Sequence, residues 1–141
     1  MKRVITFVLA LCMALSCLCL PALAAVYASP TIAVSSSTLN KGSKSGQLKI
    51  NYSVSANARA SSLGVATIEL YKDTGEYVDT ITGTTANGLV KNSNSLIHAG
   101  TYYYNNAEPG EYYYAEVTVF AVIDGVYDDY THLTSTVRAP L

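Results

Sequence analysis

The amino-acid sequence predicts an all-β protein, a single antiparallel β-sandwich domain of about seven strands that follows an N-terminal export signal. Three observations support this fold. After residue 24 the chain is rich in Thr, Ser, Tyr and Val, a composition that favours strands. Short apolar runs are separated by clusters of Gly, Asn and Asp, which favour turns. Apolar residues do not recur at helical spacing anywhere in this part of the chain.

The export signal occupies the first two dozen residues. Lys2 and Arg3 precede an apolar run from Val4 to Leu20, and Pro21 then leads into Ala22-Leu23-Ala24. This order of charged, apolar and small residues is typical of a cleaved signal peptide rather than of a transmembrane anchor. We therefore expect a signal peptide over residues 1–24, a mature β-sandwich domain over residues 25–141, and secretion of that domain.

All three cysteines, Cys12, Cys17 and Cys19, lie in the segment that we expect to be removed. The mature domain then contains no disulfide, no thiolate metal site and no cysteine nucleophile. One alternative remains open, because Leu15-Ser16-Cys17 faintly resembles a lipoprotein cleavage box, in which Cys17 would be lipidated.

Removal of Lys2 and Arg3 lowers the basic count from 9 to 7 against 10 acidic residues, so the mature domain carries a net charge of about −3. No basic stripe or tail remains to neutralise phosphates. Nucleic acid and anionic membrane surfaces are therefore not expected as partners.

The first half of the domain contains four predicted strands. An opening strand is expected near residues 31–35, and regular alternation of apolar and polar residues predicts a half-buried strand over 47–56. A strand over 65–71 meets a strand over 76–81 through an Asp-Thr-Gly turn, which predicts a hairpin. The inward side chains of the first of these two strands are expected to be Ala66, Ile68 and Leu70.

The second half contains a polar connection and three more strands. Residues 82–95 are rich in Gly and Asn and predict a connection with at most a weak strand inside it. Strands are expected over 96–104 and 112–123, and Asp124-Gly125 predicts a hairpin turn into a last strand over 127–137. In that last strand we expect an outward His132 and the inward residues Leu133, Ser135 and Val137.

Two short motifs resemble those of the fibronectin type III domains, a family of immunoglobulin-like sandwiches. Residues 48–52, Leu-Lys-Ile-Asn-Tyr, resemble the second-strand pattern L-x-I-x-W, with Tyr52 in place of the tryptophan. Residues 109–117 resemble the P-G-x-x-Y-x-V-x-V entry to the sixth strand, with Ala115 in place of a larger aliphatic residue. The resemblance implies an immunoglobulin-like antiparallel sandwich and a corner tyrosine, Tyr113, whose hydroxyl bonds back to the preceding loop. The chain also looks like small tyrosine-rich proteins exported by Gram-positive bacteria, and neither resemblance implies a function.

Few residues suit catalysis or metal binding. The only histidines are His98 and His132, and no nucleophile signature such as G-x-S-x-G surrounds any serine. Asp124, Asp128 and Asp129 gather around the last predicted turn, but their spacing does not match a calcium loop. We expect no enzyme, no metal and no cofactor.

Tyrosine is the remaining residue type whose pattern bears on function. It occurs twelve times, and six of these tyrosines form the triplets at residues 102–104 and 112–114. If the family strand order holds, the third, fourth, sixth and seventh strands form one sheet with an aromatic outer face. The predicted members of this face are Tyr71, Tyr77, Tyr112, Tyr114, Phe120 and Tyr130. Tyrosine is favoured in binding surfaces because it combines a large contact area with few rotatable bonds, although aromatic pairs also stabilise sheets without any ligand.

Three hypotheses about function follow. The first is a secreted, non-catalytic module that binds an extracellular protein or glycan through the tyrosine-rich face. The second is a structural protein that associates with itself outside the cell. The third is an enzyme or inhibitor whose active groups lie in loops.

Overall fold

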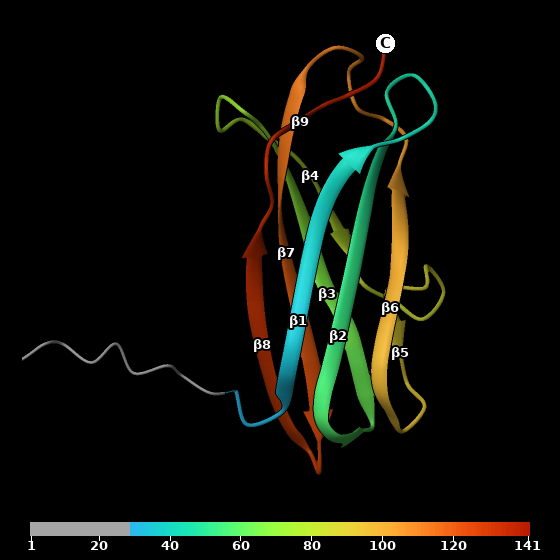
Figure 1. Ribbon diagram of the computed structural model, residues 1–141, viewed down its shortest axis with the longest axis vertical. Coiled ribbons are helices and arrows are strands. Elements are labelled where there is room, and N and C mark those ends of the chain that lie inside the picture. The colour runs from blue at the N-terminus through green and yellow to red at the C-terminus, as the bar shows by residue number, and fades with distance from the viewer. Residues whose placement is uncertain (1–28) are drawn as a thin grey trace, which may run out of the picture.

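The computed structural model describes residues 29–141, so the expected signal peptide, its cleavage site and Cys17 lie outside the described residues. The described chain is an all-β sandwich of two antiparallel sheets packed face to face (Figure 1). Among residues 29–141, no helix is long and apolar enough to cross a membrane. The predicted fold class is confirmed at the level of an all-β sandwich.

One sheet has three strands in the order β1-β2-β6. Strand β1 spans Ile32–Lys41, β2 spans Leu48–Ala60 and β6 spans Ser95–Tyr104. Strand β1 is longer than the sequence predicts. Its polar run from Ser35 to Thr38 pairs residue by residue with β2 although it carries no apolar alternation.

The other sheet has six strands, of which four follow the order β4-β3-β7-β8. The predicted grouping of these four segments into one sheet is confirmed. Their bounds are Tyr77–Thr82 for β4, Ser62–Lys72 for β3, Tyr112–Ile123 for β7 and Val126–Leu133 for β8. Two short strands complete the sheet, because β5 (Val90–Lys91) pairs with β3 and β9 (Val137–Arg138) pairs with β7.

The core lies between the sheets and follows the predicted alternation in the central strands. The most completely buried aliphatic side chains come from β2, β3 and β7 and include Leu48, Val54, Val65, Ile68, Leu70, Val117 and Val119. Ala66 departs from the prediction and is only partly buried. The reason is a register shift between Val65 and Thr67, which lets Val65 point inward in its place.

Tyr113 is the largest side chain that is almost fully buried, with 1% of its surface exposed. The backbone N–H of Glu108 donates a 2.8 Å hydrogen bond to its hydroxyl oxygen. The side chain therefore ties the start of β7 to the loop before it, as the corner resemblance implies.

The loop between β4 and β6 closes one side of the sandwich. Leu89 of this loop is buried, and the backbone N–H of Val65 donates to its carbonyl at 2.8 Å. The Tyr52 hydroxyl donates to the carbonyl of Gly88 at 2.7 Å. A side chain at Gly64 would collide with this loop, since its Cβ would lie 2.1 Å from the Leu89 carbonyl oxygen.

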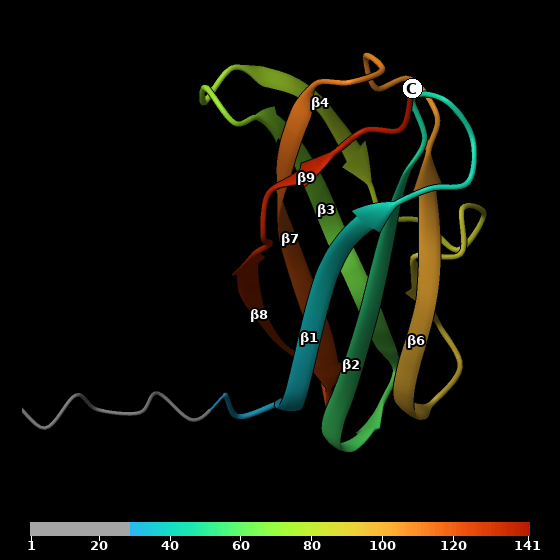
Figure 2. The same cartoon turned by 45° about the horizontal axis from the view of Figure 1, so that its top comes forward.

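Four backbone segments meet at the end of the sandwich that comes forward in Figure 2. The N–H of Gly46 donates to Pro140 at 2.9 Å, and the N–H of Gly110 donates to Ala139 at 3.1 Å. The N–H of Asp73 donates to Tyr112 at 3.0 Å. The β1–β2, β3–β4 and β6–β7 loops and the C-terminal residues therefore occupy the same end of the molecule.

The predicted last strand is divided into β8 and β9. Val137 of β9 packs against the core as predicted, Ser135 between the two strands is exposed instead of inward, and β8 has the opposite orientation to the predicted one. In the pairing of β7 with β8, His132 stands opposite the core residue Val117, and Leu133 stands opposite Glu116 on the outer face. Leu133 is accordingly 68% exposed, and His132 faces the interior side of the sheet. The prediction was wrong because β8 is an edge strand without regular apolar alternation, so its register depends on its pairing with β7.

Candidate functional site

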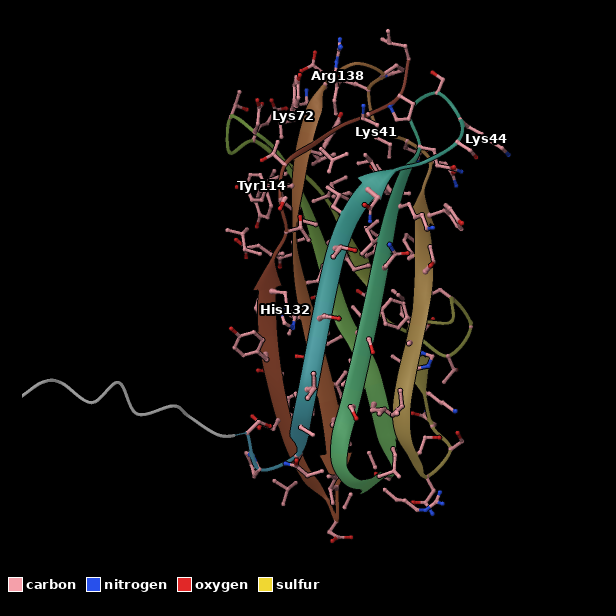
Figure 3. The ribbon with its side chains drawn as sticks, in the orientation of Figure 1. Lys41, Lys44, Lys72, Tyr114, His132 and Arg138 are labelled. Carbon is pink, nitrogen blue, oxygen red and sulfur yellow. The ribbon has the colours of Figure 1, made fainter. Side chains whose placement is uncertain are left out.

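The outer face of the six-stranded sheet carries a contiguous group of tyrosines. Cross-strand pairing places Tyr71 of β3 opposite both Tyr114 of β7 and Tyr77 of β4. Partners in such pairs point to the same side of a sheet, and this side is the outer one because their neighbours Leu70 and Ala115 are buried. Figure 3 shows Tyr114 projecting away from the three-stranded sheet.

The rings of these tyrosines contact one another across three adjacent strands. The ring centres of Tyr71 and Tyr114 are 5.3 Å apart with an interplanar angle of 11°, and those of Tyr71 and Tyr77 are 5.9 Å apart at 74°. Neighbouring strands lie about 4.8 Å apart, so the two nearly parallel rings stack across the gap between β3 and β7. One face of each ring is therefore covered by the other ring.

Two carboxylates lie beside the ring cluster. Glu69 of β3 and Glu116 of β7 stand opposite each other on the same outer face, one alternation step from Tyr71 and Tyr114. The Tyr71 hydroxyl donates a 2.8 Å hydrogen bond to Glu69. This hydrogen bond, with smaller contributions from burial and nearby negative charge, raises the pKa of Tyr71 to about 12. Tyr71 thus stays protonated at any physiological pH.

Tyr112 lies at the margin of the same face. Its side chain is 47% exposed, and the Arg138 guanidinium carbon lies 5.8 Å from its ring centre. The Nε–H of Arg138 donates to the Gly110 carbonyl at 2.7 Å, which holds the guanidinium over the ring. We call Tyr71, Tyr77, Tyr112 and Tyr114, with Glu69 and Glu116, the tyrosine face.

Phe120 shares this outer side but is not available to a partner. Only 8% of its surface is exposed, because its ring stacks on that of Tyr127 with centres 5.6 Å apart. Tyr127 stands opposite Val122 on the outer face and is itself 54% exposed. Sequence reasoning missed Tyr127, since the register that would place it outward is set only by the β7–β8 pairing.

Tyr130 was predicted on the outer face, and the structure corrects this. Tyr130 stands opposite the core residue Val119, so it points to the inner side of the six-stranded sheet, on the side of β8 that faces β1. There its ring meets that of His132, with centres 4.8 Å apart at 69°. The cause is again the register of β8.

A serine and a histidine approach each other at this edge. The Oγ of Ser35 in β1 lies 2.8 Å from the Nε2 of His132 in β8, and burial lowers the pKa of His132. Within residues 29–141, no carboxylate hydrogen-bonds the His132 ring. The pair therefore joins the two sheets but lacks the orienting acid of a catalytic triad.

The other histidine sits in the loop contact described above. His98 Nε2 lies 2.8 Å from the Gly88 carbonyl and 3.1 Å from the Tyr52 hydroxyl, an arrangement that supports the loop. No group of three or more potential metal ligands occurs in the described part of the chain.

A groove of about 330 Å³ opens between β1 and the end of β8. Its lining residues, Ser37 to Asn40 and Leu133 to Ser135, carry no charge. The groove lies on the β1 side of the sheet, away from the tyrosine face.

Comparison of the chain with protein-family models, with curated proteins and with solved structures finds no match in any of the three. The class of protein is therefore defined by the fold and the site alone. It is a small β-sandwich that presents an acidic, tyrosine-rich sheet face to solvent.

Proposed function

We propose that this protein is a secreted, non-catalytic binding module that recognises an extracellular protein through the tyrosine face. The observation that carries the proposal is the unbroken series of ring contacts from Tyr77 through Tyr71 to Tyr114 on the solvent side of three strands. Tyrosine is among the residues most enriched at binding hot spots.

The orientation of the rings favours a protein over a glycan. Sugars stack on open aromatic faces, whereas Tyr71 and Tyr114 turn their faces toward each other. Ring edges, hydroxyl groups and the carboxylates of Glu69 and Glu116 instead suit the basic and polar side chains of a protein surface. The partner that fits this chemistry carries exposed Lys or Arg.

The fold proposal is the fibronectin type III type of immunoglobulin-like sandwich. It is supported by the strand orders β1-β2-β6 and β4-β3-β7-β8 and by the Tyr113 hydrogen bond to the preceding loop. The localisation proposal, export with removal of residues 1–24, rests on the order of charged, apolar and small residues in that segment.

The test replaces Tyr77, Tyr112 and Tyr114 together with Ser and measures capture of proteins from culture supernatant and cell-envelope extract. Tyr130→Ser is the matched control, because Tyr130 is similarly exposed at 58% but points to the inner side of the sheet. Truncation of one hot-spot residue costs about 2 kcal/mol or more, so we expect at least a thirtyfold weaker capture by the triple variant.

Circular dichroism and thermal unfolding establish that both variants remain folded. Capture by the folded triple variant that equals the parent's would contradict the proposal. Capture that survives protease treatment of the extract and disappears on periodate oxidation would identify a glycan instead.

A further inference from the structure

The acidic residues are confined to the six-stranded sheet and the loops beside it, which also carry the cations Lys72, Lys91 and Arg138. Strands β1, β2 and β6 and the β1–β2 loop contain no acidic residue but carry the cations Lys41, Lys44, Lys49 and Arg59. All ten acidic residues lie between positions 69 and 129, in or next to the strands of the six-stranded sheet. Both ion pairs of the described residues involve Lys72, so the cations of the three-stranded sheet form none.

The outer face of the three-stranded sheet, which we call the polar face, carries hydrogen-bonding side chains over the part that begins at Lys49. Val34 and Ile97 stand exposed toward its other end. Lys49 and Tyr103 stand opposite each other on the polar face. Next to them, Thr101 Oγ1 donates to Asn51 at 2.9 Å, and the Asn51 side-chain amide donates to Thr38 at 3.4 Å, which forms a ladder across three strands. Such a surface offers hydroxyl groups, amides and one cation. The hydroxyl groups and amides can hydrogen-bond to the hydroxyl groups of the tyrosine face, and the cation can pair with its carboxylates.

The complementary groups also lie at the same end of the molecule. Lys49 is the second residue of β2, directly after the β1–β2 loop, and Tyr114 is the third residue of β7. Figure 3 shows Lys41, Lys44 and Tyr114 toward the end where the C-terminal Arg138 lies. Two molecules in the same orientation can therefore stack with the polar face of one against the tyrosine face of the other. In such a stack, Lys49 of the first molecule approaches Glu69 and Glu116 of the second.

We propose that a second copy of this chain is a partner of the tyrosine face, bound through its polar face. This inference rests on the proposed function, because it names the occupant of the same binding surface. The two surfaces are different patches of one molecule, so the contact is heterologous and repeats without closing. The product is a head-to-tail stack of sandwiches.

The size of the contact makes this association weak and sensitive to salt. Three strands of ten residues cover roughly 14 by 33 Å, which corresponds to roughly 900 Å² buried in total over both copies. Stable interfaces bury about 1,200 Å² or more, so stacks form only at high protein concentration. Salt weakens them, because the Debye length falls from about 10 Å at 0.1 M to about 3 Å at 1 M ionic strength.

The experiment is sedimentation equilibrium of the purified protein over a range of concentrations, at low salt and at about 1 M salt. We expect the average mass to rise with concentration at low salt and to fall back to that of the monomer at high salt. Lys49→Glu and Glu116→Lys should each raise the dissociation constant about tenfold or more, because each brings like charges together. Lys91→Glu, on β5, makes the same change in net charge as Lys49→Glu and should have little effect.

Mixing the two variants gives the decisive result. An equimolar mixture of Lys49→Glu and Glu116→Lys should associate again, because the tyrosine face of the first variant meets the unaltered polar face of the second. A parent that stays monomeric at all concentrations, or variants that associate as the parent does, would overturn the inference. Lys49→Glu leaves the tyrosine face intact, so loss of stacking with retained capture of other proteins separates this inference from the proposed function.

Discussion

At the scale of single residues, Tyr113 is the clearest case of a side chain with one defined role. Its ring fills the core between the sheets, and its hydroxyl accepts the N–H of Glu108. Its neighbour Tyr112 points the other way, toward Arg138 and solvent. The two residues therefore form a natural pair of test and control positions.

Tyr113→Phe should lower the free energy of unfolding by about 0.5 to 1.5 kcal/mol, since one net hydrogen bond is lost while the ring remains. Tyr112→Phe should leave that free energy almost unchanged. Urea denaturation of both variants measures the difference. Equal midpoints would contradict the orientation of the two side chains.

His132 makes the stability of the sandwich depend on pH. Burial lowers the pKa of His132 below the ordinary value near 6.5, so protonation of its imidazole is less favourable in the folded state than in the unfolded state. This contribution to stability is present above a pH of about 6.5 and is lost as the pH falls toward the lower folded-state pKa. On the same side of β8 lie Asp128 and Tyr130, and β1 supplies the uncharged Ser35.

We expect the free energy of unfolding of the parent to fall between about pH 7 and pH 5.5, and His132→Asn to lose part of this dependence. His98→Asn is the control, because it removes the other histidine. Urea midpoints across this pH range give the comparison. Parallel curves for His132→Asn and the parent would exclude His132 as the source.

At the scale of elements, the edge strand β8 shows how pairing overrides local sequence. Tyr127, Asp129 and Leu133 share the outer face with β7 residues, while Tyr130 and His132 face β1. Leu133 is consequently exposed to solvent although it is apolar, and Tyr130 does not belong to the tyrosine face.

Leu133→Ala should therefore change the free energy of unfolding by less than about 0.5 kcal/mol. Leu39→Ala, the same substitution at a residue of β1 that is only 4% exposed, should cost about 2 to 4 kcal/mol because it leaves a cavity. Chemical denaturation of the two variants decides between the orientations. A comparable loss in both would restore the inward position of Leu133.

At the scale of the whole molecule, the domain is stabilised without a disulfide, since all cysteines lie before residue 20. Its stability comes from the apolar layer between the sheets and from the loops that close its ends and side. The two outer faces differ in chemistry, and this difference is the basis of both proposals.

We expect the signal peptide to be cleaved between Ala24 and Ala25, because small residues at Ala22 and Ala24 follow the apolar run. The mass of the intact secreted protein measures this directly. A mature chain that begins at a lipid-modified Cys17 would instead place the protein on a membrane surface.

The sequence by itself determined the strands in the centre of the sandwich, the buried row from Leu48 to Ala56 and the inward position of Tyr113. It did so because a strand with one buried face records its orientation in the alternation of apolar and polar residues. It also placed Tyr71, Tyr77, Tyr112 and Tyr114 on one face, since these residues lie in or beside such strands.

Only the tertiary structure decided the orientation of β8, the covering of Phe120 by Tyr127 and the contact of Ser35 with His132. An edge strand that buries little apolar surface carries no alternating signal, so its faces are assigned by hydrogen bonding to its neighbour. The stacking of Tyr71 on Tyr114 was likewise decided by the tertiary structure. It joins β3 and β7, which are distant in sequence and adjacent only after folding.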